Sequence, residues 1–134
     1  LHREFDPQHL SNVLWSYAKL AVRDEQMFEA CAVQIQSRGL EYLSRTPQNI
    51  SNTVWGFGTV AVRSASFCNA LEEDIMNGSL FYGKLTETRP LQKSSRAQIA
   101  MTIISLHRLG MDNCAWRLFD RLAADGLQAG GESY

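Results

Sequence analysis

Amide and basic side chains recur at matched places in the chain and could bind a ligand through hydrogen bonds and charge. The residues concerned occur in two copies about 40 positions apart: Gln8 and Gln48, Asn12 and Asn52, Arg23 and Arg63. An amide can bond two atoms on the edge of a nucleotide base, and a guanidinium binds phosphate. Asn is a poor helix former, so its place inside a helical pattern needs a reason. Base recognition is one reason, and a ladder of hydrogen bonds to a neighbouring repeat is the other.

Two further positions on the same polar arc differ between the copies. Ser16 and Lys19 of the first copy are replaced by Gly56 and Thr59 in the second. Such variation is expected where each repeat recognises a different base, and equally at unconstrained surface positions. The small residues Ser16 and Gly56, and likewise Ala18 and Gly58, also suit a close approach of two helices.

Large aromatic and basic residues complete the candidate site. Trp15 and Trp55 border the polar arc, where they could stack on a base, although packing is the more frequent role of tryptophan at helical spacing. The candidate phosphate contacts are Lys19, Arg23, Arg63, Arg96 and Arg108. Arg23 and Arg63 fall at predicted helix ends, where a cation also complements the helix dipole, so a purely structural role is open for both.

The residues of common catalytic and metal sites do not form recognisable sets. His2, His9 and His107 have no carboxylate or cysteine at ligand or catalytic spacing, and no phosphate-binding glycine loop is present. The three cysteines are Cys31, Cys68 and Cys114, without a CxxC pair, which favours reduced, buried thiols. No apolar run approaches the roughly 20 residues of a membrane span. We therefore expect no enzyme, metal, cofactor, small-molecule substrate or membrane partner.

The elements that carry these residues are repeated helical hairpins. Residues 7–23 (PQHLSNVLWSYAKLAVR) match residues 47–63 (PQNISNTVWGFGTVAVR). Asp6-Pro7 and Thr46-Pro47 are favourable helix starts, because the side-chain oxygen caps the backbone N–H groups and proline suits the first helical position. Asp24 and Ser64 predict a second helix in each unit. The apolar arc covers more than half of the first helix, so it predicts contacts on two sides.

The fold class predicted is therefore all-α, an α-solenoid of antiparallel helical hairpins with a period of about 40 residues. The second helices are expected near 27–36 and 67–76, and a third pair near 96–109 and 113–123, with Ser95 as a cap and Trp116, Phe119 and Leu122 facing inward. The predicted units are repeat 1 at about 5–44, repeat 2 at about 45–83, a loop insertion at about 84–94, a divergent repeat 3 at about 95–124 and a frayed tail at 125–134.

The phrase F-x-P-Q-x-L-S-N-x-L-W-x-Y-A-K-L, read from Phe5 to Leu20 and in weaker form from Thr46 to Val60, resembles the octotricopeptide repeat. It is similar also to heptatricopeptide arrays, some of which carry a RAP domain. The resemblance implies an α-solenoid that binds single-stranded RNA in a chloroplast or mitochondrion and governs RNA maturation, stability or translation.

Charge placement is the one independent argument for RNA. The expected first helices are net basic and the second helices net acidic, although the whole chain has a formal charge of −1. A basic face favours phosphate binding through counterion release. Two other readings stay open, because helical repeats also serve as protein-interaction scaffolds and as spacers within longer arrays.

Overall fold

The computed structural model describes residues 6–43, 47–77, 80–81 and 93–133, and within them the chain is helical, without strands. Its elements are α1 (Pro7–Lys19), α2 (Glu25–Arg38), a 3₁₀ turn η1 (Leu40–Tyr42), α3 (Pro47–Thr59), α4 (Ala65–Met76), α5 (Lys93–Arg108) and α6 (Asp112–Ser133). The predicted all-α class is confirmed.

Three of the predicted helix caps are present. The carboxylate of Asp6 accepts a bond from the His9 N–H at 3.0 Å, and Asp24 accepts one from Met27 at 3.1 Å. The hydroxyl of Ser64 accepts the third, at 3.3 Å. Each cap satisfies a backbone donor that a helix start leaves unpaired. The fourth predicted cap, Thr46, lies outside the described residues.

The third pair of helices is longer than the sequence predicted. α5 begins at Lys93, so Ser95 lies inside the first turn and does not cap the helix. α6 continues to Ser133, where a helix end near residue 123 and a frayed tail from residue 125 were expected. The helix can continue past residue 123 because no proline follows Pro90 to interrupt it. The glycines of this stretch each cost about 1 kcal/mol relative to alanine, but they leave every backbone donor in place.

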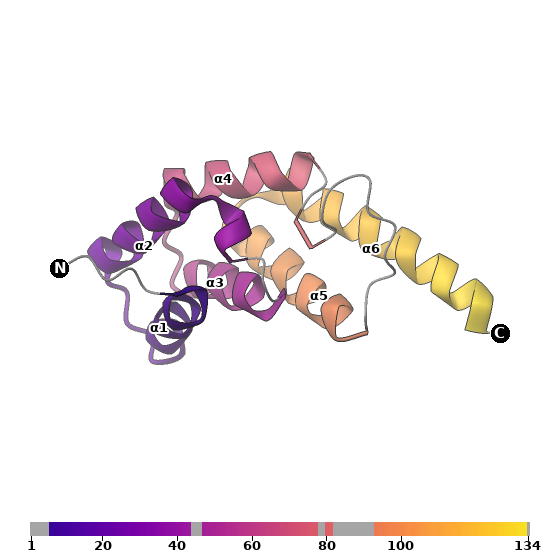
Figure 1. The fold of residues 1–134 in the computed structure, drawn as a ribbon, viewed down its shortest axis with the longest axis horizontal. Coiled ribbons are helices and arrows are strands. Elements are labelled where there is room, and N and C mark those ends of the chain that lie inside the picture. The colour runs from indigo at the N-terminus through magenta and orange to yellow at the C-terminus, as the bar shows by residue number, and fades with distance from the viewer. Residues whose placement is uncertain (1–5, 44–46, 78–79, 82–92, 134) are drawn as a thin grey trace.

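The helices form two layers, which Figure 1 shows from the side. In one layer α1 packs against α3 and α3 against α5, and in the other α2 packs against α4 and α4 against α6. Neighbours in the first layer run in the same direction, because Ser11 contacts Asn49 near the start of α1 and α3 and Trp15 contacts Trp55 further along.

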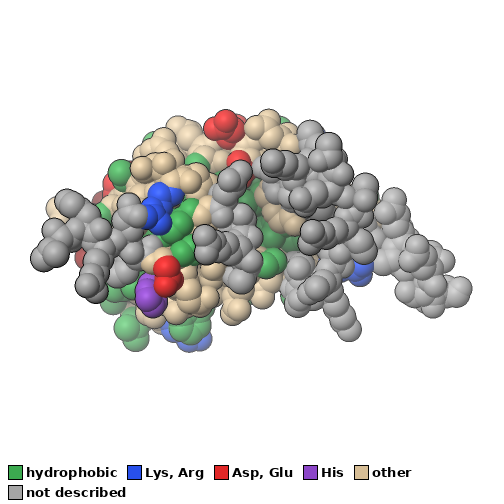
Figure 2. Space-filling model, viewed as in Figure 1, with side chains coloured by type: hydrophobic (Ala, Val, Ile, Leu, Met, Phe, Trp, Pro, Cys, Tyr) green, Lys and Arg blue, Asp and Glu red, His purple; other side chains and the backbone are tan. Residues whose placement is uncertain are grey.

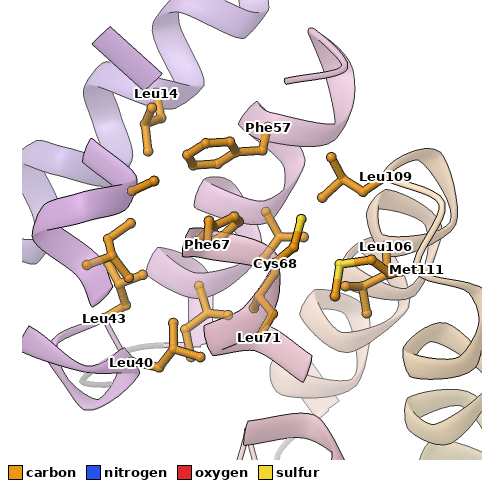
Figure 3. Close-up of a cluster of buried hydrophobic side chains, with 14 of the residues drawn as sticks. Leu14, Leu40, Leu43, Phe57, Phe67, Cys68, Leu71, Leu106, Leu109 and Met111 are labelled. Atoms are coloured by element: carbon orange, nitrogen blue, oxygen red, sulfur yellow. The ribbon is translucent and has the colours of Figure 1, made fainter. Parts of the chain in front are cut away.

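The core lies between the layers and is centred on Phe57 (Figure 3). The Phe57 ring packs edge-on against Phe28 of α2, with centroids 5.0 Å apart, and stacks on Phe67 of α4 at 4.2 Å. One side chain of α3 thus joins both helices of the second layer that lie beside it. From α5, Leu106 belongs to the same buried cluster as Cys68 of α4 (Figure 3).

Three residues in the left-handed backbone region occupy matching positions after the first-layer helices, and they define which residues of these helices correspond. Ala21, Ala61 and Gly110 have φ of 57°, 57° and 75°, each just past the end of its helix. A residue of α3 therefore corresponds to the residue 40 positions earlier in α1 and 49 positions later in α5.

Each first-layer helix has four faces, because successive residues are about 100° apart. For α3 these are an inner face toward the second layer (Ile50, Val54, Phe57), an upstream face toward α1 (Asn49, Thr53, Gly56, Val60), a downstream face toward α5 (Ser51, Gly58, Val62) and an outer face (Gln48, Asn52, Trp55, Thr59). The same names are used below for the corresponding residues of α1 and α5.

Two glycines of α3 set how closely these helices approach. A Cβ on Gly56 would lie 3.1 Å from the carbonyl oxygen of Leu14, and one on Gly58 would lie 3.0 Å from that of Ser105. Both contacts are tight and both involve backbone, which yields less readily than a side chain. The prediction that these small residues allow close helix approach is confirmed.

The three cysteines are free and buried, as expected. Burial raises the pKa of Cys31 to about 11 and also raises the pKa of Cys68 and Cys114. The unfolded chain therefore loses these protons at lower pH than the folded one, and the free energy of unfolding should fall as pH rises from about 9 toward about 11. Urea unfolding across this range measures the slope. Cys31→Val should flatten it, and an unchanged slope in that variant would contradict the assignment.

Candidate nucleic-acid interface

The repeated polar residues share one face of the molecule, the outer faces of α1, α3 and α5. These residues point away from the second layer, and all are exposed except Asn52 and Trp55, which are half-buried. The outer faces are Gln8, Asn12, Trp15 and Lys19 on α1, Gln48, Asn52, Trp55 and Thr59 on α3, and Ala97, Met101, Ile104 and Arg108 on α5. The predicted site residues Gln8, Asn12, Lys19, Gln48, Asn52, Thr59 and Arg108 are thus brought together on one surface.

The two tryptophans meet at the centre of this surface. Their ring centroids are 6.2 Å apart with a 35° tilt, and the ammonium of Lys19 lies 5.5 Å from the Trp15 centroid. Trp55 is half-buried and packs against the core, which agrees with the packing role. Trp15 keeps 37% of its surface exposed, so an aromatic edge and a cation are both accessible beside each other.

In α1 the amides bond each other and not the neighbouring repeat. The side-chain amide of Gln8 donates to Oδ1 of Asn12 at 3.2 Å, within the same helix. The bond between neighbouring helices is instead made by Ser11, whose hydroxyl donates to the buried side chain of Asn49 at 3.3 Å. Asn12 therefore has accessible polar atoms on the outer face.

Four predicted site residues lie elsewhere, and two of these serve the packing. Arg23 donates to the Ala61 carbonyl at 3.3 Å and pairs with Glu25 at 2.9 Å. The Arg63 guanidinium lies next to Gly110, the corresponding turn of α5, 3.1 Å from where a Cβ would stand. Both arginines thus lie on the turn that follows the next helix of the layer, a structural contact different from the dipole interaction with their own helix that the sequence suggested. Ser16 is on the upstream face of α1, and Arg96 is half-buried between the inner and downstream faces of α5, away from the outer face.

The two layers separate the charges. α1, α3 and α5 contain no Asp or Glu, and α1 and α5 carry basic residues, whereas each helix of the other layer contains acidic residues. Hydrophobic and basic side chains lie side by side at the lower left edge of Figure 2, over α1. An anion at this surface meets no acidic group of the helices that form it.

Two histidines have carboxylate partners, which the sequence reading missed. His9 lies 3.3 Å from Asp6, and Nδ1 of His107 lies 2.8 Å from Asp112. The first pair joins a helix cap to the first turn, and the second closes the turn between α5 and α6. Among the described residues no group of three or more His, Cys, Asp or Glu side chains could hold a metal ion.

The inward orientation predicted for Trp116 and Phe119 is wrong. They are 63% and 47% exposed, pack edge to face at 5.5 Å, and leave the core positions of α6 to Cys114, Ala115 and Leu118. The register of α6 explains this, because the helix starts at Asp112 and turns its 114, 115 and 118 positions toward α4 and α5. Leu122 is half-buried.

Comparison with protein-family models, with curated proteins and with solved structures finds no significant match to the chain. Within the described residues, no helix has both the length and the apolar character needed to cross a membrane.

Proposed function

We propose that the chain is part of an α-solenoid of antiparallel helical hairpins, with a period of about 40 residues, that binds single-stranded RNA and catalyses no reaction. The outer faces of α1, α3 and α5 form the binding surface. The observation that carries the proposal is the contact between Trp15 and Trp55, flanked by amides and Lys19 on three helices without acidic residues. The resemblance to octotricopeptide repeats supports the same assignment and a place in organellar RNA maturation, stability or translation.

Base recognition is assigned to the aromatic and amide groups. Unpaired bases stack on exposed aromatic rings, and this contact is tolerant of sequence because every base has a flat face. Amides at Gln8, Asn12, Gln48 and Asn52 lie beside the rings and can bond the edges of the same bases. Duplex RNA hides those edges in its deep major groove, so a single strand is the better ligand.

Phosphate binding is assigned to Lys19 and Arg108, which occupy corresponding positions at the ends of their outer faces, with Thr59 between them on α3. Both side chains are exposed and neither is next to an acidic residue of its own helix. Arg23 is left out of the assignment because its guanidinium already bonds Ala61 and Glu25.

The test is the binding of short, labelled single-stranded RNA pools between about 50 and 200 mM salt, measured by fluorescence anisotropy. Affinity should fall as salt rises, with a slope of about 0.7 per phosphate contact in a plot of log affinity against log salt. Lys19→Glu and Arg108→Glu should each weaken binding and reduce that slope.

The matched control is Arg117→Glu, the same charge reversal at an exposed position of α6 in the acidic layer. It should leave affinity and slope close to those of the unchanged protein. Undetectable binding at the lowest salt, or equal losses for Lys19→Glu and Arg117→Glu, would overturn the proposed surface.

A protein-interaction scaffold is the second candidate function, and the exposed aromatics of α6 favour it. Trp116 and Phe119 lie on the opposite layer from the tryptophan pair. A scaffold that used only this surface would show no RNA binding that Lys19→Glu could weaken. The RNA titrations therefore separate the two functions. A pure spacer would show neither activity.

A further inference from the structure

The downstream face of α5 is open, although the same face is covered twice elsewhere in the layer. On α1 this face holds Ser11 and Ala18, which are buried under α3. On α3 it holds Gly58, packed against α5. On α5 the corresponding residues within the helix, Ala100 and His107, are exposed, and only Met111, beyond the turn, is buried. The downstream faces of α1 and α3 are thus each covered by the next helix of the layer, whereas that of α5 is not covered in the described structure.

Beside that face is a groove between α5 and α6 of about 290 Å³, with an almost wholly apolar lining. It is lined by Ile103, His107, Asp112, Ala115, Trp116 and Phe119. The corresponding groove between α1 and α2 is filled by Phe57 of the next helix, whose ring packs on Phe28. Leu106, the residue of α5 that corresponds to Phe57, is fully buried in the same core cluster as Phe67, Cys68 and Leu71 of α4 (Figure 3).

The residue that corresponds to Phe57 and Leu106 on α1 is Tyr17, which is half-buried and keeps part of its ring accessible. The upstream face of α1 is open as well. Its residues are His9, Val13, Ser16 and Leu20, and Leu20 is 75% exposed. The corresponding residues of α3 (Asn49, Thr53, Gly56, Val60) are all buried against α1. The chain therefore carries both halves of one contact, with each half exposed.

We propose that the groove between α5 and α6 binds α1 of a second copy of this chain, with Tyr17 of that copy inserted at the position that Phe57 and Leu106 occupy in the two contacts within the chain. We infer this occupant from the two contacts within the chain. In each of them, α1 with α3 and α3 with α5, the downstream face of one helix packs against the upstream face of the next, and α1 has an exposed upstream face. In the contact between α1 and α3, the small residue Gly56 packs against Leu14. In the proposed contact, Ser16 of the second copy takes the place of Gly56.

The register of the contact is that of α1 on α3. There the closest approach is at Leu14, which corresponds to Ile103 of α5. The alternative register, used by α3 on α5, has its closest approach at Gly58, and the corresponding residue of α5 is the large side chain of His107. With Ile103 at the closest approach, His107 and Asp112 remain at the edge of the groove, where polar groups suit the hydroxyl of an inserted tyrosine.

The two surfaces are different, so the contact is heterologous and leaves a free end on each copy. Association should therefore continue beyond a dimer as concentration rises. The proposal concerns the edges of the layers and does not depend on RNA binding by the outer faces.

Sedimentation velocity over a concentration series tests it. The unchanged protein should show an average mass that rises steadily with concentration. Leu20→Arg and Trp116→Arg should each be monomeric, because each blocks one half of the contact. Their equimolar mixture should form a dimer that cannot extend, since one intact half remains on each variant. The matched control is Val33→Arg, at a 52% exposed apolar position of α2 outside both surfaces, which should associate like the unchanged protein.

A monomer at every concentration for the unchanged protein would overturn the proposal, as would a mixture of the two variants that stays monomeric. Circular dichroism shows whether each variant is folded, and Ser16→Arg and Phe119→Arg replace either one that is not. All these variants leave the outer faces intact, so they should keep their RNA binding. An unchanged protein that binds RNA but never self-associates would count against this inference alone.

Discussion

Replacing Phe57 with alanine should lower the free energy of unfolding by about 3–5 kcal/mol. The ring is fully buried, packs on Phe28 at 5.0 Å and stacks on Phe67 at 4.2 Å. Its removal leaves a cavity where α3 meets both α2 and α4, and the helices around it can close that space only in part. A loss of this size is a large share of the 5–15 kcal/mol typical of a folded domain. Urea unfolding followed by circular dichroism measures it.

Trp116→Ala is the matched control, because it removes a still larger aromatic ring from a 63% exposed position. Its effect on the free energy of unfolding should stay within about 0.5 kcal/mol, as for most surface substitutions. Equal losses for the two variants would mean that Phe57 is not the centre of the core or that Trp116 is buried in solution.

Trp15→Ala should weaken the binding of short single-stranded RNA by about 10-fold, since stacking of one base contributes about 1–3 kcal/mol. The change also removes the ring beside which the ammonium of Lys19 lies, so the cation loses a fixed position. The loss should persist at high salt, because stacking involves no counterion release, whereas the loss caused by Lys19→Glu should shrink as salt is added. Anisotropy titrations at two salt concentrations separate the two contributions.

Trp15→Phe and Trp116→Ala are the controls for this prediction. Phenylalanine keeps an aromatic face and should restore most of the affinity, while loss of the tryptophan on the opposite layer should leave affinity unchanged. Should Trp116→Ala weaken binding as much as Trp15→Ala does, the RNA would have to contact the other layer and the assignment of the surface would be wrong.

Three of the helix starts and the grouping of the candidate site residues on one face could be predicted because they depend on local sequence. Asp6, Asp24 and Ser64 act as caps through bonds to backbone only three residues away. The outer faces follow from the helical period, which places Gln8, Asn12 and their copies opposite the apolar positions.

The orientation of Trp116 and Phe119 could not be predicted in the same way. A wide apolar arc does not say which part of it a neighbour covers, and α4 and α5 cover the side of α6 that holds Ala115 and Leu118. The aromatic residues were assigned inward because large apolar side chains are usually buried. Which side of α6 is buried depends on how this helix packs against α4 and α5, and that tertiary contact cannot be read from the sequence pattern.

The roles of Arg23 and Asn49 were also beyond the sequence alone. Arg23 bonds the Ala61 carbonyl, a partner 38 residues away, and Asn49 accepts its bond from Ser11 across the same separation. Both depend on how α1 lies on α3. The left-handed turns at Ala21 and Ala61 could not be predicted either, because alanine is uncommon in that backbone region. Of the three corresponding turns, the third has the expected glycine, Gly110.

The separation of charge between the layers has a consequence for how the molecule approaches other molecules. A chain with a formal charge of −1 exerts little net pull on a distant polyanion. The basic residues of α1 and α5 nevertheless lie in the opposite layer from the net negative helices α2, α4 and α6, so the described helices have an electric dipole directed from one layer to the other. In the field of a polyanion this dipole experiences a torque that turns α1, α3 and α5 forward before contact. Orientation, more than attraction, is what the charges of this protein supply.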